Sequence, residues 1–302
     1  MNIIFGPVNS RRFGLSLGVD LSPTTKQCNF DCVYCELKPA KPILSAQNVP
    51  SVDEVVVQVR QAFDKKLEFD FITLTANGEP SLYPHLDELI KALNFIKQDK
   101  KLMILSNGTG VLSELKFNAM LGLDVAKFSL DSAVEKTFFR VDKALKSINL
   151  AQMIDKMAEF KGIFKGQLVM EVLVVQGLND NEAEFKALNA AFARIKPDRV
   201  DIGTIDRPSA YPVKATSDER LSKLATLITS APVLLPKRHL SGKDIEFDET
   251  QLLKMLALRP QSELDIKAMS ANSKARLQKL LESSQIWVEE LAGVKFYRAK
   301  VE

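Results

Sequence analysis

The chain has 302 residues, with 41 Lys and Arg against 38 Asp and Glu, and 46% of its residues are hydrophobic. This length suits one large domain plus a small one, and the hydrophobic fraction is ordinary for a globular protein. The sequence has no apolar run of the roughly 20 residues that a membrane-spanning helix needs, and no signal peptide is visible. A net charge of +3 is too small to require a nucleic-acid partner. We therefore expect a cytoplasmic protein with no membrane partner.

Strand and helix patterns alternate over most of the chain. Short apolar or β-branched runs predict buried strands, and helical periodicity behind capping boxes that begin at Ser51 and Thr216 predicts helices. The predicted strands span residues 15–21, 69–75, 102–105, 126–130, 168–175 and 199–205. The predicted helices span residues 52–66, 84–97, 112–121, 151–160, 181–195 and 221–229. Six such units predict an α/β fold with a parallel sheet and helices outside it, either a barrel or a doubly wound sheet.

The pattern changes after about residue 248. Short helices are expected at 250–258, 263–269 and 273–281, followed by strands at 286–289 and 294–297 with a turn at Ala292 and Gly293. Three helices and a β-hairpin predict a winged helix. We therefore expect two domains, a barrel at 1–248 and a winged helix at 249–302.

The whole excess of positive charge lies in this second domain. Residues 250–302 hold nine Lys and Arg against six Asp and Glu, whereas the rest of the chain holds 32 of each. Lys274, Arg276 and Lys279 lie on the helix that reads DNA in helix-turn-helix proteins. They indicate either a nucleic-acid contact or a solvated basic face on a protein-docking module.

All three cysteines of the chain lie within eight residues, at Cys28, Cys32 and Cys35. A structural zinc site needs four nitrogen or sulfur ligands, and the two histidines, His85 and His239, are far away in sequence. An odd number of cysteines disfavours a disulfide framework. A [4Fe-4S] cluster normally takes one thiolate on each iron, so three thiolates leave one iron open to another molecule.

The spacing of these cysteines, with Phe30 and Tyr34 among them, resembles the signature of the radical S-adenosylmethionine (SAM) superfamily. The segment from Asn77 to Pro80 follows a predicted strand and resembles the superfamily's GGEP motif, with Asn77 in place of the first Gly. The resemblance implies a TIM-like partial (β/α)6 barrel rather than a doubly wound sheet. It implies a [4Fe-4S] cluster on the three cysteines, SAM as cofactor, and an external one-electron reductant such as a flavodoxin or ferredoxin.

The resemblance also indicates which residues contact SAM. Tyr34 is expected near the adenine, and Asn77, Gly78 and Glu79 near the methionine amino group. Functional residues of α/β barrels lie at the carboxyl ends of the strands, which adds Ser106, Asn107, Ser129, Asp131 and Glu171. The alternatives are a simple turn at Ser106 and Asn107, a helix cap at Asp131, and a buried ion pair of Glu171 with Arg140 or Arg207.

The stretch at residues 5–21, FGPVNSRRFGLSLGVDL, resembles radical SAM proteins related to the wyosine-type tRNA-modifying synthases. Arg11 and Arg12 in it are candidates for binding an acidic substrate group or a phosphate, or for ion pairs in the barrel floor. Arg140 and Arg207 are further substrate candidates. The wyosine-forming relatives carry a second set of cysteines, which this sequence lacks. The substrate therefore stays open between RNA or tRNA and a protein or small molecule, and a non-catalytic iron–sulfur regulator that binds DNA is the third alternative.

Overall fold

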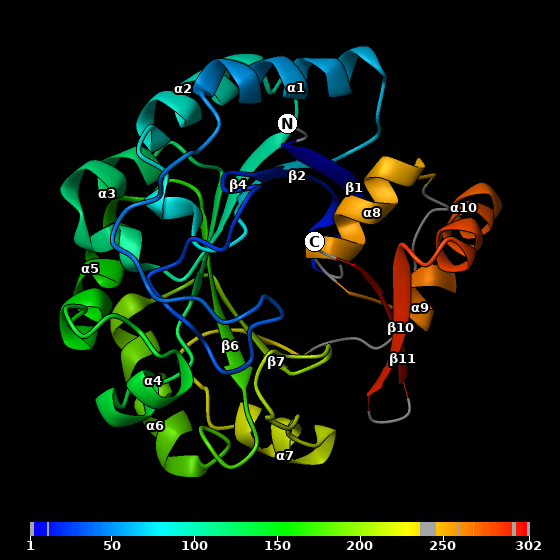
Figure 1. Cartoon of the computed structure of the whole chain (residues 1–302). Coiled ribbons are helices and arrows are strands. Elements are labelled where there is room, and N and C mark those ends of the chain that lie inside the picture. The colour runs from blue at the N-terminus through cyan, green and yellow to red at the C-terminus, as the bar shows by residue number, and fades with distance from the viewer. Residues whose placement is uncertain are drawn as a thin grey trace.

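An eight-stranded sheet, with its strands in sequence order from β1 to β8, dominates the structure. The structure is a computed structural model that describes residues 3–10, 12–235, 246–258, 260–267, 269–291 and 294–300. β1 and β2 are antiparallel, and every later pair of neighbours is parallel. The sheet curves, and its helices lie on the outside (Figure 1). Because the strand order never reverses, the sheet is singly wound and not doubly wound, and the predicted α/β fold with a parallel sheet is confirmed.

The six predicted strands are all present, as β2 to β7, and six predicted helical regions lie between and after them. The strands are β1 (Ile4–Ser10), β2 (Gly14–Asp20), β3 (Phe71–Thr75), β4 (Lys101–Ser106), β5 (Val125–Ser129), β6 (Gln167–Val174), β7 (Arg199–Thr204) and β8 (Val233–Leu234). The helices are α1 (Val52–Asp64), α2 (Leu86–Ile96), α3 (Glu114–Met120), α4 (Glu135–Val141), α5 (Leu150–Ile163), α6 (Glu182–Ile195) and α7 (Asp218–Ala225), with short 3₁₀ turns η1 (Pro80–Leu82) and η2 (Thr109–Leu112).

The two predicted capping boxes have different outcomes. Ser51 caps α1, and its backbone and side chain exchange hydrogen bonds with Glu54 as predicted. The prediction for α7 was one residue early, because Ser217 and not Thr216 is the N-cap. Thr216 is buried instead. Its backbone N–H donates to Thr204 Oγ1 at 2.8 Å, and this hydrogen bond holds Thr216 against the last residue of β7.

Two groups of apolar side chains support the barrel. The outer group packs the strands against the helices, with Ile72, Leu74, Leu89 and Leu93 fully buried, each contributing about 1.5–3 kcal/mol. The inner group lies inside the barrel, near the amino ends of the strands, and consists of Phe13, Phe71, Met103, Val125 and Val169. It fills the end of the barrel at the amino ends of the strands.

The C-terminal unit, residues 246–300, has a hydrophobic core of its own, which includes Leu252, Leu256, Leu277 and Ile286. The three predicted helices and the two hairpin strands are present, together with a short strand, β9, that was not predicted. Its elements are α8 (Glu249–Leu258), β9 (Gln261–Ser262), α9 (Glu263–Lys267), α10 (Ala271–Glu282), β10 (Ile286–Leu291) and β11 (Val294–Ala299). The predicted turn at Ala292 and Gly293 lies outside the described residues.

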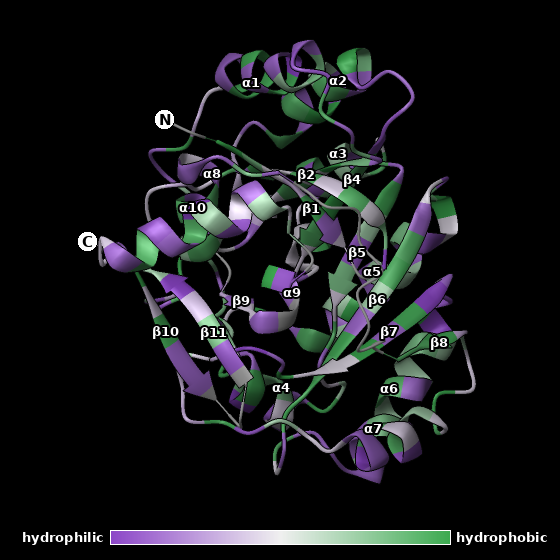
Figure 2. Cartoon of the chain, turned by 90° about the vertical axis from the view of Figure 1, so that its right-hand side faces the viewer, coloured by the Kyte–Doolittle hydropathy of each residue, from purple (hydrophilic) through white to green (hydrophobic). Residues whose placement is uncertain are grey.

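The C-terminal unit lies beside the barrel, with α8 against β1 (Figure 1). Figure 2 looks onto this unit, with α8, α10 and the β10–β11 hairpin in front of the barrel. Lys254 on α8 donates to the carbonyl of Ile4 on β1 at 3.3 Å. None of the helices within the described ranges has the length and apolarity needed to cross a bilayer.

Candidate functional site

The cysteine loop, residues 21–47, follows β2 and is held against the exit of β3. Gln27 donates its backbone N–H to Asn77 O at 2.8 Å and accepts from Glu79 N at 2.8 Å, so it forms a parallel bridge with Gly78. Gly78 has φ +142°, and a Cβ atom there would lie 1.9 Å from Gln27 O. A side chain is therefore excluded at this position, and the glycine joins the cysteine loop directly to the Asn77–Pro80 segment.

The three cysteines are free thiols on this loop. Burial, together with the charge of Glu79, raises the pKa of Cys28 to about 12. Burial and nearby Asp142 raise the pKa of Cys32, and burial raises that of Cys35. Without a metal the site therefore favours neutral thiols, and binding of iron would have to release their protons.

The donor set fits an iron–sulfur cluster better than a single ion. Within the ranges that the structure describes, no three His, Cys, Asp or Glu side chains are spaced to hold one metal ion, whereas a cluster takes its thiolates on separate irons. Cys28 Sγ accepts from Phe30 N at 3.3 Å and from Asn107 Nδ2 at 3.9 Å. Hydrogen bonds of this kind stabilise cluster thiolates and tune the potential.

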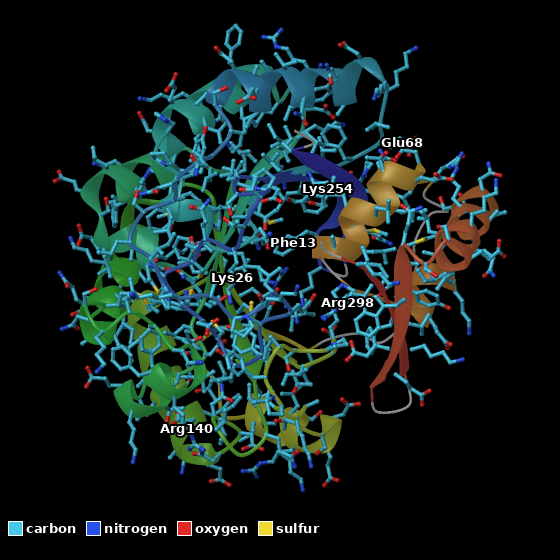
Figure 3. All side chains as sticks on the ribbon, viewed as in Figure 1. Phe13, Lys26, Glu68, Arg140, Lys254 and Arg298 are labelled. Atoms are coloured by element: carbon cyan, nitrogen blue, oxygen red, sulfur yellow. The ribbon has the colours of Figure 1, made fainter. Side chains whose placement is uncertain are left out.

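Lys26 brings a positive charge to the cysteine loop. Its Nζ lies 2.8 Å from Asp31 Oδ1, and Figure 3 shows it over the middle of the barrel. Burial lowers the pKa of Lys26, but the nearby Cys35 and Asp31 outweigh burial and the net shift is upward. A lysine that stays charged here would offset part of the negative charge of three thiolates.

Glu79 holds the exits of β3 and β4 together. Its carboxylate is buried and accepts from Ser81 N at 2.9 Å, Ser106 Oγ at 2.6 Å and Asn107 N at 2.7 Å. Burial raises its pKa, although these hydrogen bonds oppose the shift. Ser106 and Asn107 are therefore more than a simple turn, because they connect Glu79 to the Cys28 sulfur.

The side chain of Asn77 has an atom without a partner. Its Oδ1 is buried and has no hydrogen bond within the described part of the chain, and the same holds for Asp20 Oδ2. Asp20 Oδ1 accepts from Asn77 N at 3.0 Å, which fixes the turn. A buried acceptor with no partner is costly, so this pair fits a site where a ligand donor completes the hydrogen bonding.

Asp131 is an anchor and not a helix cap, because the N-cap of α4 is Val134. Its carboxylate accepts from Tyr34 OH at 2.5 Å and from Leu173 N at 2.7 Å, and its carbonyl accepts from Asn179 Nδ2 at 2.8 Å. Burial raises the pKa of Asp131 to about 6. Asp131 thus fixes the ring of Tyr34 next to Cys35.

Glu171 forms an ion pair inside the barrel, but not with the partners that were predicted. Arg12 Nη1 and Lys127 Nζ both contact Glu171 Oε1, at 2.7 Å and 2.6 Å, so Arg140 and Arg207 were wrong as its partners. Burial raises the pKa of Glu171, but Lys127 and Arg12 outweigh burial and lower it. The side chain is 34% exposed, and Oε2 has no hydrogen bond to any residue that the structure describes.

The other predicted residues are spread over the molecule. Ser129 is the residue of β5 opposite Glu171 and is partly exposed. Arg207 is buried between the barrel and Asp265 of the C-terminal unit, at 3.2 Å. Arg140 is exposed on α4, far from the centre of the barrel in Figure 3. Arg11 lies outside the described residues.

Sequence reasoning missed Lys26, Lys127, Asn179 and Asp201. Asp201 is fully buried and pairs with Arg199 at 2.6 Å, and it lies 3.4 Å from Arg12. Lys127 on β5 and Asp201 on β7 are charged residues within otherwise apolar strands. Such a residue is a signal of a buried ion pair that the sequence could have given. Lys26 and Asn179 lie in loops, where the pattern gives no such signal.

Comparison with known proteins agrees with this site. Residues 22–188 match the family model described as the radical SAM superfamily. A UPF0026 protein of Helicobacter pylori is 40% identical over 98% of this chain and 97% of its own length. This identity extends well beyond the cysteine loop.

Two solved structures share the fold. Streptococcus suis SuiB bound to S-adenosylmethionine aligns with a TM-score of 0.57 and 17% identity, over 74% of this chain and 51% of SuiB. TYW1 with a lysine–pyruvate adduct aligns with a TM-score of 0.52 and 18% identity, over 70% of this chain and 72% of TYW1. The resemblance inferred from the cysteines and the Asn77–Pro80 segment is confirmed, and the chain belongs to the radical SAM superfamily of enzymes, which use an iron–sulfur cluster and SAM.

Proposed function

We propose that this protein holds a [4Fe-4S] cluster on Cys28, Cys32 and Cys35 and cleaves SAM reductively. The observation that carries the proposal is the bridge between Gln27 and Gly78, which joins the three-thiol loop to the segment expected to bind SAM. When bound, the cluster supplies one electron to SAM, whose C–S bond breaks to give methionine and a 5′-deoxyadenosyl radical that takes a hydrogen atom from the substrate. The cluster needs an external reductant, for which we propose a flavodoxin or ferredoxin.

The residues of the chain have two kinds of role in this proposal. In this proposal, Asn77 Oδ1 and the backbone of Gly78 accept hydrogen bonds from the amino group of SAM, and Tyr34 contacts the adenine. Glu79 and Asp131 hold neighbouring residues in place, because their carboxylate oxygens already accept hydrogen bonds from those residues. Ser106 shares that role, since its hydroxyl donates to Glu79 and accepts from Gly108 N at 3.0 Å.

The test is anaerobic reconstitution with iron and sulfide, reduction with dithionite, and chromatographic assay of 5′-deoxyadenosine formed from SAM. We expect product from the native protein and none from Cys32→Ala, because two thiolates cannot hold the cluster in the required geometry. Lys161→Ala, in a partly exposed pair with Asp198 on the outside of the barrel, serves as the matched control and should keep full activity. A reduced, fully loaded native protein that never forms 5′-deoxyadenosine would contradict the proposal.

RNA is the first candidate for the substrate, with residues 249–302 acting as a winged-helix domain. α10 lies on the side of the C-terminal unit away from the barrel (Figure 1), and its Lys274 and Lys279 are exposed. Arg276 is occupied, since it donates to Glu246 at 3.1 Å and to Phe247 O at 2.7 Å. Lys274 and Lys279 have no ion pair within the part of the chain that the structure describes, and two such cations on an outer helix favour a phosphate backbone as the partner.

A protein or small molecule is the alternative, with the C-terminal unit as a docking module. Arg12 beside Glu171 inside the barrel suits an anionic group on either kind of substrate. So does Arg207, whose buried Nε and Nη1 have no hydrogen bond within the described residues. The RNA candidate predicts that the purified protein carries RNA, seen as excess absorbance at 260 nm and released by salt. Lys274→Glu with Lys279→Glu should abolish this RNA, and native protein free of RNA at low salt would favour the alternative.

A further inference from the structure

Three loops around the cluster site carry an unbalanced set of charges. They are residues 36–47 after the last cysteine, 142–148 after α4, and 209–215 after β7. They carry five lysines, of which Lys38, Lys41, Lys146 and Lys214 are exposed and Lys143 is partly exposed, against one partly exposed acid, Glu36. Outside the C-terminal unit the chain has almost equal numbers of acidic and basic residues, so five lysines against one partly exposed acid are a local excess.

The three loops form one continuous surface. Asp31, the residue before Cys32, accepts from Ala40 N at 3.3 Å and from the hydroxyl of Tyr211. Lys143 Nζ donates to that hydroxyl at 2.5 Å, and Ala210 N donates to Cys35 O at 2.9 Å. Hydrogen bonds thus connect each loop to the cysteine loop itself.

A pocket of about 370 Å³ opens on this surface. Its lining is Asp31, Pro39, Ala40, Lys41, Pro42 and Lys143. Asp31 lies between Cys28 and Cys35 in the sequence, so the pocket reaches the loop that carries the thiols. The acids beneath the surface are already paired, because Asp31 contacts Lys26 at 2.8 Å and Glu36 lies 3.8 Å from Arg207. Lys143 is held by Asp31 at 3.4 Å, whereas Lys38, Lys41, Lys146 and Lys214 have no ion pair within the described residues and are left for an outside partner.

We propose that this lysine surface, defined by Lys38, Lys41, Lys143, Lys146 and Lys214, is the docking surface for an acidic one-electron carrier protein. The inference rests on the proposed function, because only a cluster that must be reduced from outside needs such a partner. Electron transfer requires the carrier to approach the cluster closely, and this surface is formed by the cluster loop. A cationic surface steers an acidic partner and raises its association rate. In the step itself the carrier is oxidised by one electron and the cluster is reduced by one, and no bond is formed or broken.

The experiment compares two reductants on the reconstituted full-length protein. One is dithionite, which is small and needs no docking surface, and the other is a reduced bacterial flavodoxin of net negative charge. The test variant is Lys38→Glu with Lys41→Glu and Lys146→Glu, which leaves Lys143 and its bonds to Tyr211 and Asp31 intact. The matched control reverses three exposed lysines on the outer helices and loops, Lys65→Glu with Lys91→Glu and Lys186→Glu, so that both variants have the same net charge.

We expect all three proteins to form 5′-deoxyadenosine at the same rate with dithionite, within about twofold. With flavodoxin, the test variant should lose at least about tenfold in kcat/KM, chiefly through KM, while the control stays near the native value. The native flavodoxin-driven rate should fall steeply as ionic strength rises. Equal flavodoxin-driven rates in the test and control variants, or a native rate that does not respond to salt, would overturn the proposal.

A binding measurement separates this proposal from the proposed function. Calorimetric titration of flavodoxin into the reconstituted proteins at low salt should give binding to native and control protein and at least about tenfold weaker binding to the test variant. If dithionite gives no 5′-deoxyadenosine with native protein, the proposed function fails, and the titration still decides the docking surface. Equal affinities for all three proteins would reject the surface even if SAM is cleaved.

Discussion

Gly78→Ala should destabilise the protein by at least about 3 kcal/mol, because the new methyl group would overlap backbone atoms. Its Cβ would lie 1.9 Å from Gln27 O and 2.4 Å from Gln27 C, and the φ of +142° is one that L side chains rarely adopt. The cysteine loop would have to leave the exit of β3 to make room. We expect a lower urea midpoint, and less iron bound after reconstitution because Cys28 follows Gln27.

The matched control is Gly162→Ala. Gly162 lies in α5, and nothing lies within 4 Å of the position its Cβ would take. Since alanine is the better helix former, this variant should gain about 0.5–1 kcal/mol. Equal stability of the two variants would show that the close approach of Gly78 to Gln27 does not exist in solution.

Asp265→Asn should cost about 2–3 kcal/mol, because it leaves a buried guanidinium without its closest counter-charge. Arg207 is 4% exposed and contacts Asp265 at 3.2 Å, whereas the next carboxylate, Glu36, is 3.8 Å away. The substitution keeps the size of the side chain and an oxygen that can still accept from Ser262 N at the start of α9. Urea denaturation followed by fluorescence of Trp287, in the C-terminal unit, measures the loss.

Two further variants identify the cause. Arg207→Met combined with Asp265→Asn should recover most of the lost stability, because the unpaired buried charge is then absent. Glu219→Gln breaks an exposed pair with Lys223 on α7 and should change stability by less than about 0.5 kcal/mol. A double variant as unstable as the single one would mean that Asp265 acts through the cap of α9 and not through Arg207.

The strands that are buried, continuous runs of apolar residues were predicted from the sequence. β1 and β8, which form only by pairing with an adjacent strand, were not predicted. β3 and β6 are buried runs of β-branched and apolar residues, which is a local signal. β1 contains Gly6 and Pro7, which weaken any strand pattern, and it pairs with β2 through a register shift between Phe5 and Val8. β8 has two residues and exists only because β7 provides an edge.

The same division runs through the site. The three cysteines lie within eight residues, and Asn77–Pro80 is one continuous segment, so each motif could be identified from its own spacing. The partner of Glu171 was not, because Arg12 is 159 residues away and reaches it only when the β1–β2 turn enters the barrel. The predicted roles of Glu79 and Asp131 as cofactor contacts stay predictions. Their side-chain hydrogen bonds indicate support of neighbouring groups, which a sequence pattern does not reveal.

The position of α8 along β1 has a consequence for solubility. β1 is the first strand of an open sheet, so one of its two edges has no strand beside it among the described residues. An uncovered edge of this kind invites pairing with the same strand of another molecule, which is a common route to aggregation. α8 lies against β1, and Lys254 donates to the Ile4 carbonyl. The C-terminal unit therefore covers an edge of the barrel where another molecule could otherwise pair, whatever else it binds.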